Sequence, residues 1–234
     1  MTTPSPSPSL IGTLTLALAL VGCEKHEPPT VAETPVPAET ISLFDGETLD
    51  GWSHVLVDDT LKIEDVWSVK DGAIVCKGEP LGYLVTDDSF QDFKLTLEWR
   101  WAAEPTNSGV LLRIAGEPIG FMPKCVEAQL MHESAGDIWA FRGAKVDGPE
   151  ERIKTVEDHE DLGDFRGVEK TKMAENPPGE WNRYEIIVQG DTIRVSLNGQ
   201  PINEAHSLDI VSGPIGLQSE GSEIHFRNIE VEEL

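Results

Sequence analysis

The sequence predicts an all-β protein built as a sandwich of two antiparallel sheets. Short segments alternate apolar and polar residues with the period of a half-buried strand along most of the chain. Dipeptides that favour tight turns, such as Asp71-Gly72 and Asn198-Gly199, separate these segments. No long amphipathic helix is convincing. One sandwich domain over 41–234, with an irregular insertion near 142–179, accounts for this pattern.

The expected strands can be placed in order along the chain. Asp71-Gly72 joins 67–70 to 73–76 as a hairpin. The clearest strand is 93–101, whose odd positions are apolar and predicted to face the core. Its outward polar residues are Lys94, Thr96, Glu98 and Arg100. The other expected strands are 41–44, 82–86, 107–114, 125–133, 184–188, 192–197, 200–203, 214–218 and 224–231.

Two central segments, 107–114 and 125–133, carry a polar patch in mid-strand. Alternation puts Arg113 beside Leu111 on one face of the first segment, opposite Val110, Leu112 and Ile114. In the second segment one face holds Val126, Ala128 and Leu130, and the other holds Cys125, Glu127, Gln129 and Met131. A glutamate and a glutamine near an arginine on a neighbouring strand form a surface that could hold a sugar.

The insertion is the irregular part of the chain. A short strand at 137–141 is expected, but 146–178 has no clear period. A structureless connection of that length is often a lid or binding loop. The alternative is a surface insertion held by salt links, and the sequence does not choose between them.

The N-terminal residues predict export and a lipid anchor. An apolar run over 10–22 has signal-peptide length and ends in Leu-Val-Gly-Cys, which is similar to a bacterial lipobox. We therefore expect a signal peptide at 1–22, lipidation of Cys23 and an extended tether to residue 40, with the protein on the periplasmic side or outer membrane of a cell envelope. The segment before the run lacks Lys and Arg, and an ordinary cleaved signal is the alternative.

Charge and cysteine content restrict the partners. With 42 acidic against 18 basic residues the formal net charge is −24, which argues against nucleic acid and against an anionic membrane surface. Membrane contact is expected only through the lipid anchor. Besides Cys23 the chain has Cys76 and Cys125, which could pair or be buried free thiols.

The order of motifs resembles the bacterial 3-keto-disaccharide hydrolase family over 41–234. No single motif is specific, but their order is. The matching pieces are 44–46 (FDG), 49–52 (LDGW), 67–72 (WSVKDG), 92–95 (DFKL), 98–100 (EWR), 107–110 (NSGV), Arg113, 126–130 (VEAQL), 179–182 (GEWN), 197–199 (LNG), 216–218 (GLQ) and 226–229 (FRNI). The resemblance implies a concanavalin A-like or glucanase-like jelly-roll sandwich with a ligand groove on its concave sheet. Family members carry Asp-His-Gly where this chain has Ser219-Glu220-Gly221, and an aspartate where it has His132.

The resemblance also implies cleavage of glycosides that carry a ketone at C3, with an oligosaccharide or glycoside as substrate. The ketone acidifies the C2 proton, so a base can remove it, the C1–O bond can leave by elimination, and water can add. We expect Glu127 to be the base and Arg113 or a divalent ion to stabilise the enolate. His132 and Glu220 are candidate acids. Candidates for substrate binding are Asn107, Gln129, Gln218, Trp139 and Arg100.

Several alternatives stay open. Glu127, Asp137, Glu220 and His132 could hold calcium or manganese. Unaided by the resemblance, Glu127 reads as a solvated carboxylate paired with Arg113 or Arg100. The chain could also be a conventional two-carboxylate glycosidase, a non-catalytic carbohydrate-binding lipoprotein or an envelope scaffold domain. We find no nucleophile elbow, phosphate loop, dinucleotide fingerprint or zinc-protease motif.

Overall fold

A computed structural model describes residues 1–3, 5, 39–102 and 104–234. Most of the expected signal peptide, the lipidated Cys23 and most of the tether lie outside these residues. Within them, no helix is long and apolar enough to cross a membrane.

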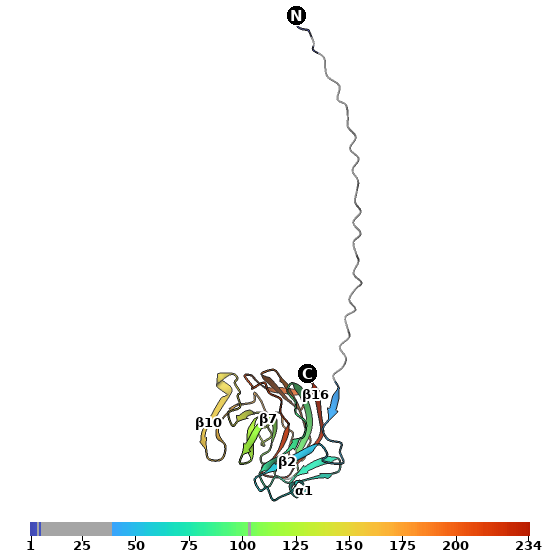
Figure 1. Ribbon diagram of the computed structural model, residues 1–234, viewed down its shortest axis with the longest axis vertical. Coiled ribbons are helices and arrows are strands. Elements are labelled where there is room, and N and C mark those ends of the chain that lie inside the picture. Colours follow the sequence, from blue (N-terminus) through green and yellow to red (C-terminus); the bar gives the residue numbers. More distant parts are fainter. Residues whose placement is uncertain (4, 6–38, 103) are drawn as a thin grey trace. The chain divides into compact units, whose positions relative to one another are not determined.

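Two antiparallel sheets of eight strands each face one another (Figure 1). The first sheet has the order β14 (Gln200–Ala205), β13 (Thr192–Leu197), β12 (Asn182–Gln189), β6 (Phe93–Trp101), β16 (Ile224–Glu233), β4 (Ala73–Cys76) and β3 (Trp67–Lys70), with β1 (Thr40–Ser42) also paired to β16. The second has the order β10 (Ile153–His159), β11 (Gly163–Val168), β9 (Ile138–Phe141), β8 (Met122–Gln129), β7 (Gly109–Ile119), β15 (Gly216–Ser219), β5 (Gly82–Thr86) and β2 (Trp52–Leu56). The described helices are only α1 (Ile63–Val66) and the 3₁₀ turn η1 (Glu150–Arg152).

The core lies between the sheets and follows the predicted alternation. Leu95, Leu97, Trp99 and Trp101 of β6 are buried, as expected from their odd positions. Trp99 packs edge-on against Tyr184 with ring centroids 6.1 Å apart. The Tyr184 hydroxyl donates to the Gln129 carbonyl at 2.6 Å, which links the first sheet to β8 of the second.

The outer face of the second sheet carries a separate apolar cluster. It consists of Tyr83, Leu111, Ile114, Phe121, Met122, Cys125 and Phe141. Cys76 belongs to the core between the sheets, and both it and Cys125 are free thiols. Burial raises the pKa of each thiol, so both are poorly reactive.

The strand β7 breaks its alternation at Arg113. Arg113 has φ +51°, and the β7–β8 register shifts between Leu112 and Ala115. The prediction that Ile114 shares the face of Leu112 is therefore wrong, because the irregularity turns Ile114 toward the outer-face cluster. It also turns the Arg113 side chain away from that of Glu127.

The insertion contains a β-hairpin that sequence periodicity did not reveal. Strands β10 and β11 extend the second sheet beyond β9, at one edge of the domain in Figure 1. Most residues of β10 are exposed, so a two-residue apolar period is absent there. Arg142 donates to the Ile119 carbonyl at 2.9 Å and to the Asp161 carbonyl, and so ties the hairpin turn to the β7–β8 connection.

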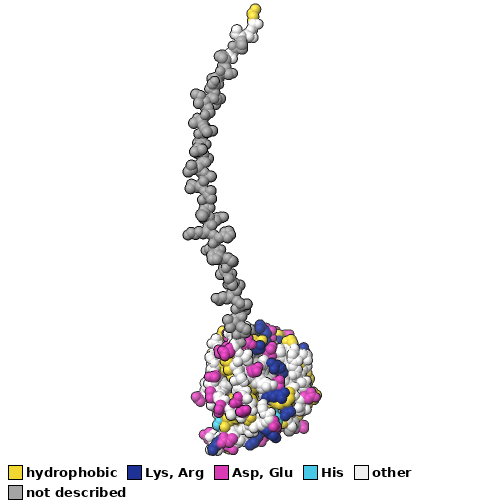
Figure 2. Space-filling view, turned by 90° about the vertical axis from the view of Figure 1, so that its right-hand side faces the viewer, with side chains coloured by type: hydrophobic (Ala, Val, Ile, Leu, Met, Phe, Trp, Pro, Cys, Tyr) yellow, Lys and Arg dark blue, Asp and Glu magenta, His cyan; other side chains and the backbone are white. Residues whose placement is uncertain are grey.

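The surface charges are mixed. Figure 2 shows acidic and basic side chains interspersed on one face of the domain, without a broad basic area.

The buried guanidinium of Arg113 generates a stability prediction. It is 3% exposed and donates to the carbonyls of Gln91, Gly190 and Asp209 and to the Asp92 carboxylate. Replacing Arg113 with Met would leave these acceptors unpaired and should lower the free energy of unfolding by roughly 2–4 kcal/mol in urea denaturation. Arg183→Met, at a half-exposed arginine 4.0 Å from Glu98, should change it by less than about 1 kcal/mol. Equal losses would contradict a structural role for Arg113.

Candidate functional site

A pocket of about 260 Å³ opens on the outer face of the second sheet. Strands β8, β9, β11 and β15 supply half of its lining residues, and the rest come from β10 and from connecting segments. Its lining residues are Asn107, Met122, Glu127, Gln129, Met131, Ser134, Asp137, Trp139, Phe141, His159, Leu162, Phe165, Gln218 and Glu220. Six of the nine residues predicted for the sugar site are among them: Asn107, Glu127, Gln129, Trp139, Gln218 and Glu220.

Glu127 lies at the bottom of this pocket. It stands on β8 between Leu111 of β7 and Trp139 of β9, and only 1% of its surface is exposed. Its carboxyl crosses the backbone of Gly109, where an added Cβ would lie 1.7 Å from Oε1. A residue with a side chain at 109 would therefore displace the carboxyl. Glycine in the NSGV segment keeps this space open.

None of the described residues gives the Glu127 carboxyl a compensating charge. Its Oε1 has no hydrogen-bond partner among the described residues. Burial raises the pKa of Glu127 well above its ordinary value, and the negative charge of Glu220 raises it further. A strong shift of this kind inside a cavity is typical of a functional carboxyl rather than of a solvated surface pair.

Glu220 is the second carboxyl of the pocket. It follows β15 and forms an isolated bridge with Asn107, which precedes β7. Burial raises the pKa of Glu220, and a hydrogen bond from the Asn107 side chain opposes the shift. The two glutamates line the same pocket because β15 and β7 are paired, although they lie far apart in the sequence.

Three amide side chains give the pocket its hydrogen-bonding capacity. The Gln129 Oε1 accepts the N–H groups of Leu130 and Met131, both at 2.8 Å, so its NH₂ is the end left for a ligand. The Oδ1 of Asn107 and the Oε1 of Gln218 are buried and, among the described residues, have no partner. Buried acceptors of this kind are costly unless something donates to them. Sugar hydroxyls would satisfy them.

An aromatic wall faces these polar groups. Trp139 is half-buried and packs edge-on against Phe165 of the hairpin, with ring centroids 5.4 Å apart. Its indole lies over Gly167, where an added Cβ would come within 2.4 Å of the ring. Trp139 therefore has a fixed orientation in the pocket wall, which suits the apolar face of a sugar ring.

His159 lines the pocket and was missed by the sequence reasoning. It ends β10, and its Nδ1 accepts the N–H groups of Asp161 and Leu162 at 3.3 and 3.2 Å. Because Nδ1 accepts hydrogen bonds, the neutral imidazole carries its proton on Nε2, which is therefore a donor. The positive charge of His159, when it is protonated, lowers the pKa of Glu220. The acidic residues around His159 in the sequence do not indicate a binding site. His159 reaches the pocket only because the β10–β11 hairpin folds beside it.

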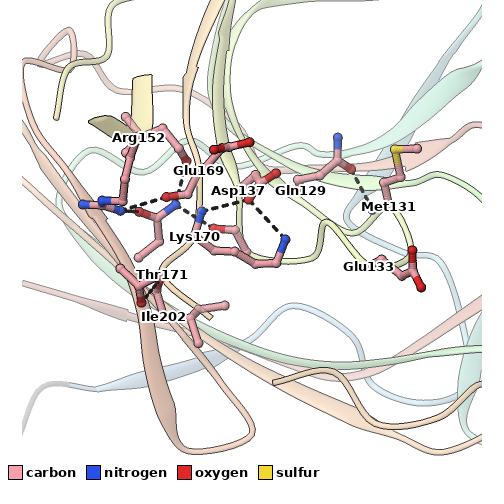
Figure 3. Close-up of polar contacts among 12 residues, drawn as sticks. Gln129, Met131, Glu133, Asp137, Arg152, Glu169, Lys170, Thr171 and Ile202 are labelled. Carbon is pink, nitrogen blue, oxygen red and sulfur yellow. Dashed lines mark hydrogen bonds and ion pairs between the residues drawn. The ribbon is translucent and has the colours of Figure 1, made fainter. Parts of the chain in front are cut away.

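One side of the pocket carries the ion pair between Asp137 and Lys170. The Asp137 Oδ1 accepts the Lys170 N–H at 2.9 Å and lies 3.4 Å from Nζ (Figure 3). Burial raises the pKa of Asp137, and the contacts with Lys170 oppose the shift. Gln129 lies nearby in the same view. This side offers both donors and acceptors.

Three predicted site residues lie elsewhere. Arg113 is bonded to four backbone and side-chain acceptors behind the strand irregularity, so it cannot stabilise an enolate at Glu127. Arg100 lies on β6 of the first sheet, 4.6 Å over the Trp181 ring, on the opposite side of the sandwich. His132 lies beyond the end of β8, does not line the pocket, and forms a 3.1 Å pair with Glu175.

The metal expectation receives no support from this arrangement. Glu127, Asp137 and Glu220 line one pocket, but His132 does not. In the described part of the chain, no three His, Cys, Asp or Glu side chains converge on a point that could hold a metal ion.

The buried carboxyl generates a pH-dependent stability prediction. Because the pKa of Glu127 is raised on folding, the native state holds more protons than the unfolded state above the ordinary value of 4.5. The free energy of unfolding therefore falls as pH rises from that value through the folded-state pKa. Glu127→Gln should melt at a higher temperature than the parent at pH 8, and this difference in melting temperature should be smaller at pH 4. Glu185→Gln, on the first sheet, is the control; a gap independent of pH would contradict the burial argument.

Known proteins share this architecture. A candidate glycosyl hydrolase from Parabacteroides distasonis has a TM-score of 0.58 at 21% identity, over 83% of this chain and 94% of its own. The carbohydrate-binding module CBM66 of Bacillus subtilis has a TM-score of 0.56 at 11% identity, over 78% of this chain and 96% of the module. The β-glucanase of Bacillus licheniformis has a TM-score of 0.54 at 9% identity, over 86% of this chain and 100% of its own. At these identities the likeness concerns the fold alone, and it confirms the expected jelly-roll sandwich.

Sequence comparison extends over the same domain. A 3-keto-disaccharide hydrolase of Bacteroides thetaiotaomicron is 22% identical over an alignment that covers 86% of this chain and 81% of that protein. Residues 39–232 match the 3-keto-alpha-glucoside-1,2-lyase-like domain. This match includes every strand that forms the pocket, and the chain therefore belongs to the 3-keto-alpha-glucoside-1,2-lyase-like domain family.

Proposed function

We propose that this protein cleaves glycosides that carry a ketone at C3, by removal of the C2 proton and elimination of the C1 substituent. The observation that carries the proposal is the Glu127 carboxyl, which is buried in the pocket and to which no described residue supplies a hydrogen bond at Oε1 or a positive charge. Family membership and the name of the Bacteroides thetaiotaomicron relative support the choice of a 3-keto sugar.

The chemistry needs one base. Ionised Glu127 takes the proton from C2, and the electron pair of the C–H bond moves into an enolate with the C3 oxygen. Collapse of the enolate forms the C1=C2 bond as the C1–O bond breaks. The departing oxygen receives a proton, and addition of water across C1=C2 completes a net hydrolysis. A raised pKa suits Glu127 to this task, because proton abstraction is most efficient when the pKa of the base is near the working pH.

The other pocket groups supply donors. The Gln129 NH₂ and the His159 Nε2–H are candidates to stabilise the enolate oxygen, in place of Arg113. Protonated Glu220 is the candidate acid for the departing oxygen, since its raised pKa keeps the proton available. Asn107 and Gln218 accept from sugar hydroxyls, and Trp139 covers an apolar face of the ring.

The first test replaces the base. With 3-keto-trehalose and 3-keto-glucosides as substrates, Glu127→Gln should lower kcat at least about a hundredfold, the usual contribution of a general base, while binding persists. Glu185→Gln, on the far sheet, should leave kcat unchanged. The assay is product formation followed by chromatography, with binding measured by calorimetry.

The outcomes separate the competing functions. Equal rates on a plain glucoside and its 3-keto form would defeat the elimination mechanism and favour a two-carboxylate glycosidase that uses Glu127 and Glu220. Binding without turnover of any 3-keto sugar by the parent would favour a non-catalytic carbohydrate-binding protein.

A second test concerns the acid. Glu220→Gln should slow cleavage of 3-keto-glucosides with alkyl leaving groups by roughly tenfold to a hundredfold or more, because an alkoxide must be protonated as it departs. Substrates with nitrophenyl leaving groups, which depart as stable anions, should lose much less. The alkaline limb of the kcat–pH profile should also disappear in this variant. A uniform loss across both leaving groups would argue against Glu220 as the acid.

A further inference from the structure

A second depression adjoins the pocket. It has a volume of about 670 Å³ and is lined by Val57, Glu79, Pro80, Leu81, Glu220 and Gly221. Glu220 is the residue that the two cavities have in common. A ligand that extends from the pocket into the depression must therefore pass Glu220.

The depression differs from the pocket in chemistry. Val57, Pro80 and Leu81 provide aliphatic walls, and Val57 is 51% exposed although it is large and apolar. Among the described residues that line it, the only polar side chains are the carboxylates of Glu79 and Glu220; none is an amide, a hydroxyl or an aromatic ring. A second sugar ring would find few donors here and no ring to stack on. An apolar group would cover exposed aliphatic surface.

The walls are held in place relative to Glu220. The Val57 N–H donates to the Leu81 carbonyl at 3.0 Å. On the opposite side, the Ser219 hydroxyl donates to the Pro80 carbonyl at 2.9 Å, and the Gly221 N–H donates to the Gly78 carbonyl at 2.6 Å. Because these bonds flank residue 220 in the chain, the aliphatic walls and the Glu220 carboxyl form one rigid unit.

The other end of the pocket is polar. A depression of about 300 Å³ lined by Ser134, Asp137, Glu169, Lys170, Thr171, Lys172 and Met173 shares Ser134 and Asp137 with the pocket. It offers the donors and acceptors that sugar hydroxyls need. The pocket therefore lies between a polar depression and an aliphatic one, and only the aliphatic one adjoins Glu220.

We infer that the depression formed by Val57, Pro80 and Leu81 binds the leaving group of the substrate, and that this group is an apolar alkyl or aryl aglycone rather than a second sugar. The inference rests on the proposed function. The acid must touch the glycosidic oxygen, so the bond that breaks lies beside Glu220 and the departing group lies on the far side of it. That side is the aliphatic depression.

The test is a series of 3-keto-glucosides with methyl, butyl and hexyl aglycones. Their leaving alcohols have similar acidities, so differences in kcat/KM report binding of the chain. A fully buried methylene contributes about fourfold, and in this open depression we expect about twofold each, which gives roughly a 30-fold rise from methyl to hexyl. Val57→Asn and Leu81→Asn should flatten the series, so that kcat/KM of each variant changes less than about threefold from methyl to hexyl. Val211→Asn, at another exposed valine that lines neither cavity, should preserve the slope.

The outcomes distinguish this inference from the function on which it rests. A flat series with efficient turnover of the methyl compound would overturn the inference and leave the proposed function intact. So would a 3-keto-disaccharide preferred tenfold over the hexyl glucoside. If no 3-keto-glycoside is turned over, the proposed function fails. Calorimetric titration with unoxidised methyl, butyl and hexyl glucosides then tests the depression alone, and affinity independent of chain length would overturn the inference there too.

Discussion

The site depends on a buried carboxyl group that has no oppositely charged partner in the described part of the chain. Glu127 stands in mid-strand with its side chain packed over the backbone of Gly109, and the nearest charge that affects it is the like charge of Glu220. Such a group is costly to the fold, because burial favours its neutral form and its oxygen lacks a donor. Proteins keep such groups where chemistry needs them. The same burial that destabilises the ionised form makes the carboxylate a stronger base toward a carbon acid.

The fold tolerates this cost because the two faces of the second sheet have different roles. One face packs Val110, Val126 and Ala128 into the main core, so β7 and β8 are held independently of the pocket. The outer face carries a small apolar cluster and the polar groups of the site. The hairpin β10–β11 then adds His159 and Phe165 above the sheet, and Arg142 ties its turn to the β7–β8 connection. The second sheet and the hairpin above it therefore hold the hydrogen-bond donors and acceptors of the pocket in place before a ligand binds.

Arg113, Arg100 and Arg227 make structural contacts away from the pocket. Arg113 holds together the segments around Gln91, Gly190 and Asp209 at one irregular point of β7. Arg100 and Arg227 both lie against the Trp181 ring on the first sheet, at 4.6 and 3.9 Å. Of the described residues that line the pocket, none is an arginine. In the proposed mechanism the enolate is therefore stabilised by neutral donors, which do not lower the pKa of Glu127 as a nearby cation would.

The sequence by itself determined the all-β class, most strands, the buried tryptophans of β6, and the face that Glu127 and Gln129 share, because a two-residue period and tight-turn dipeptides are local properties. It also indicated the family, through the order of its motifs. The positions of Arg113, His159 and Glu220 depended on tertiary structure. The left-handed backbone conformation at Arg113 turned its side chain away from the expected face. The exposed β10–β11 hairpin, which has no apolar period, brought His159 to the pocket. The pairing of β15 with β7 brought Glu220 beside Glu127. Strand irregularities and long-range pairing leave no periodic signal in the chain, so only the assembled sheets reveal which side chains meet.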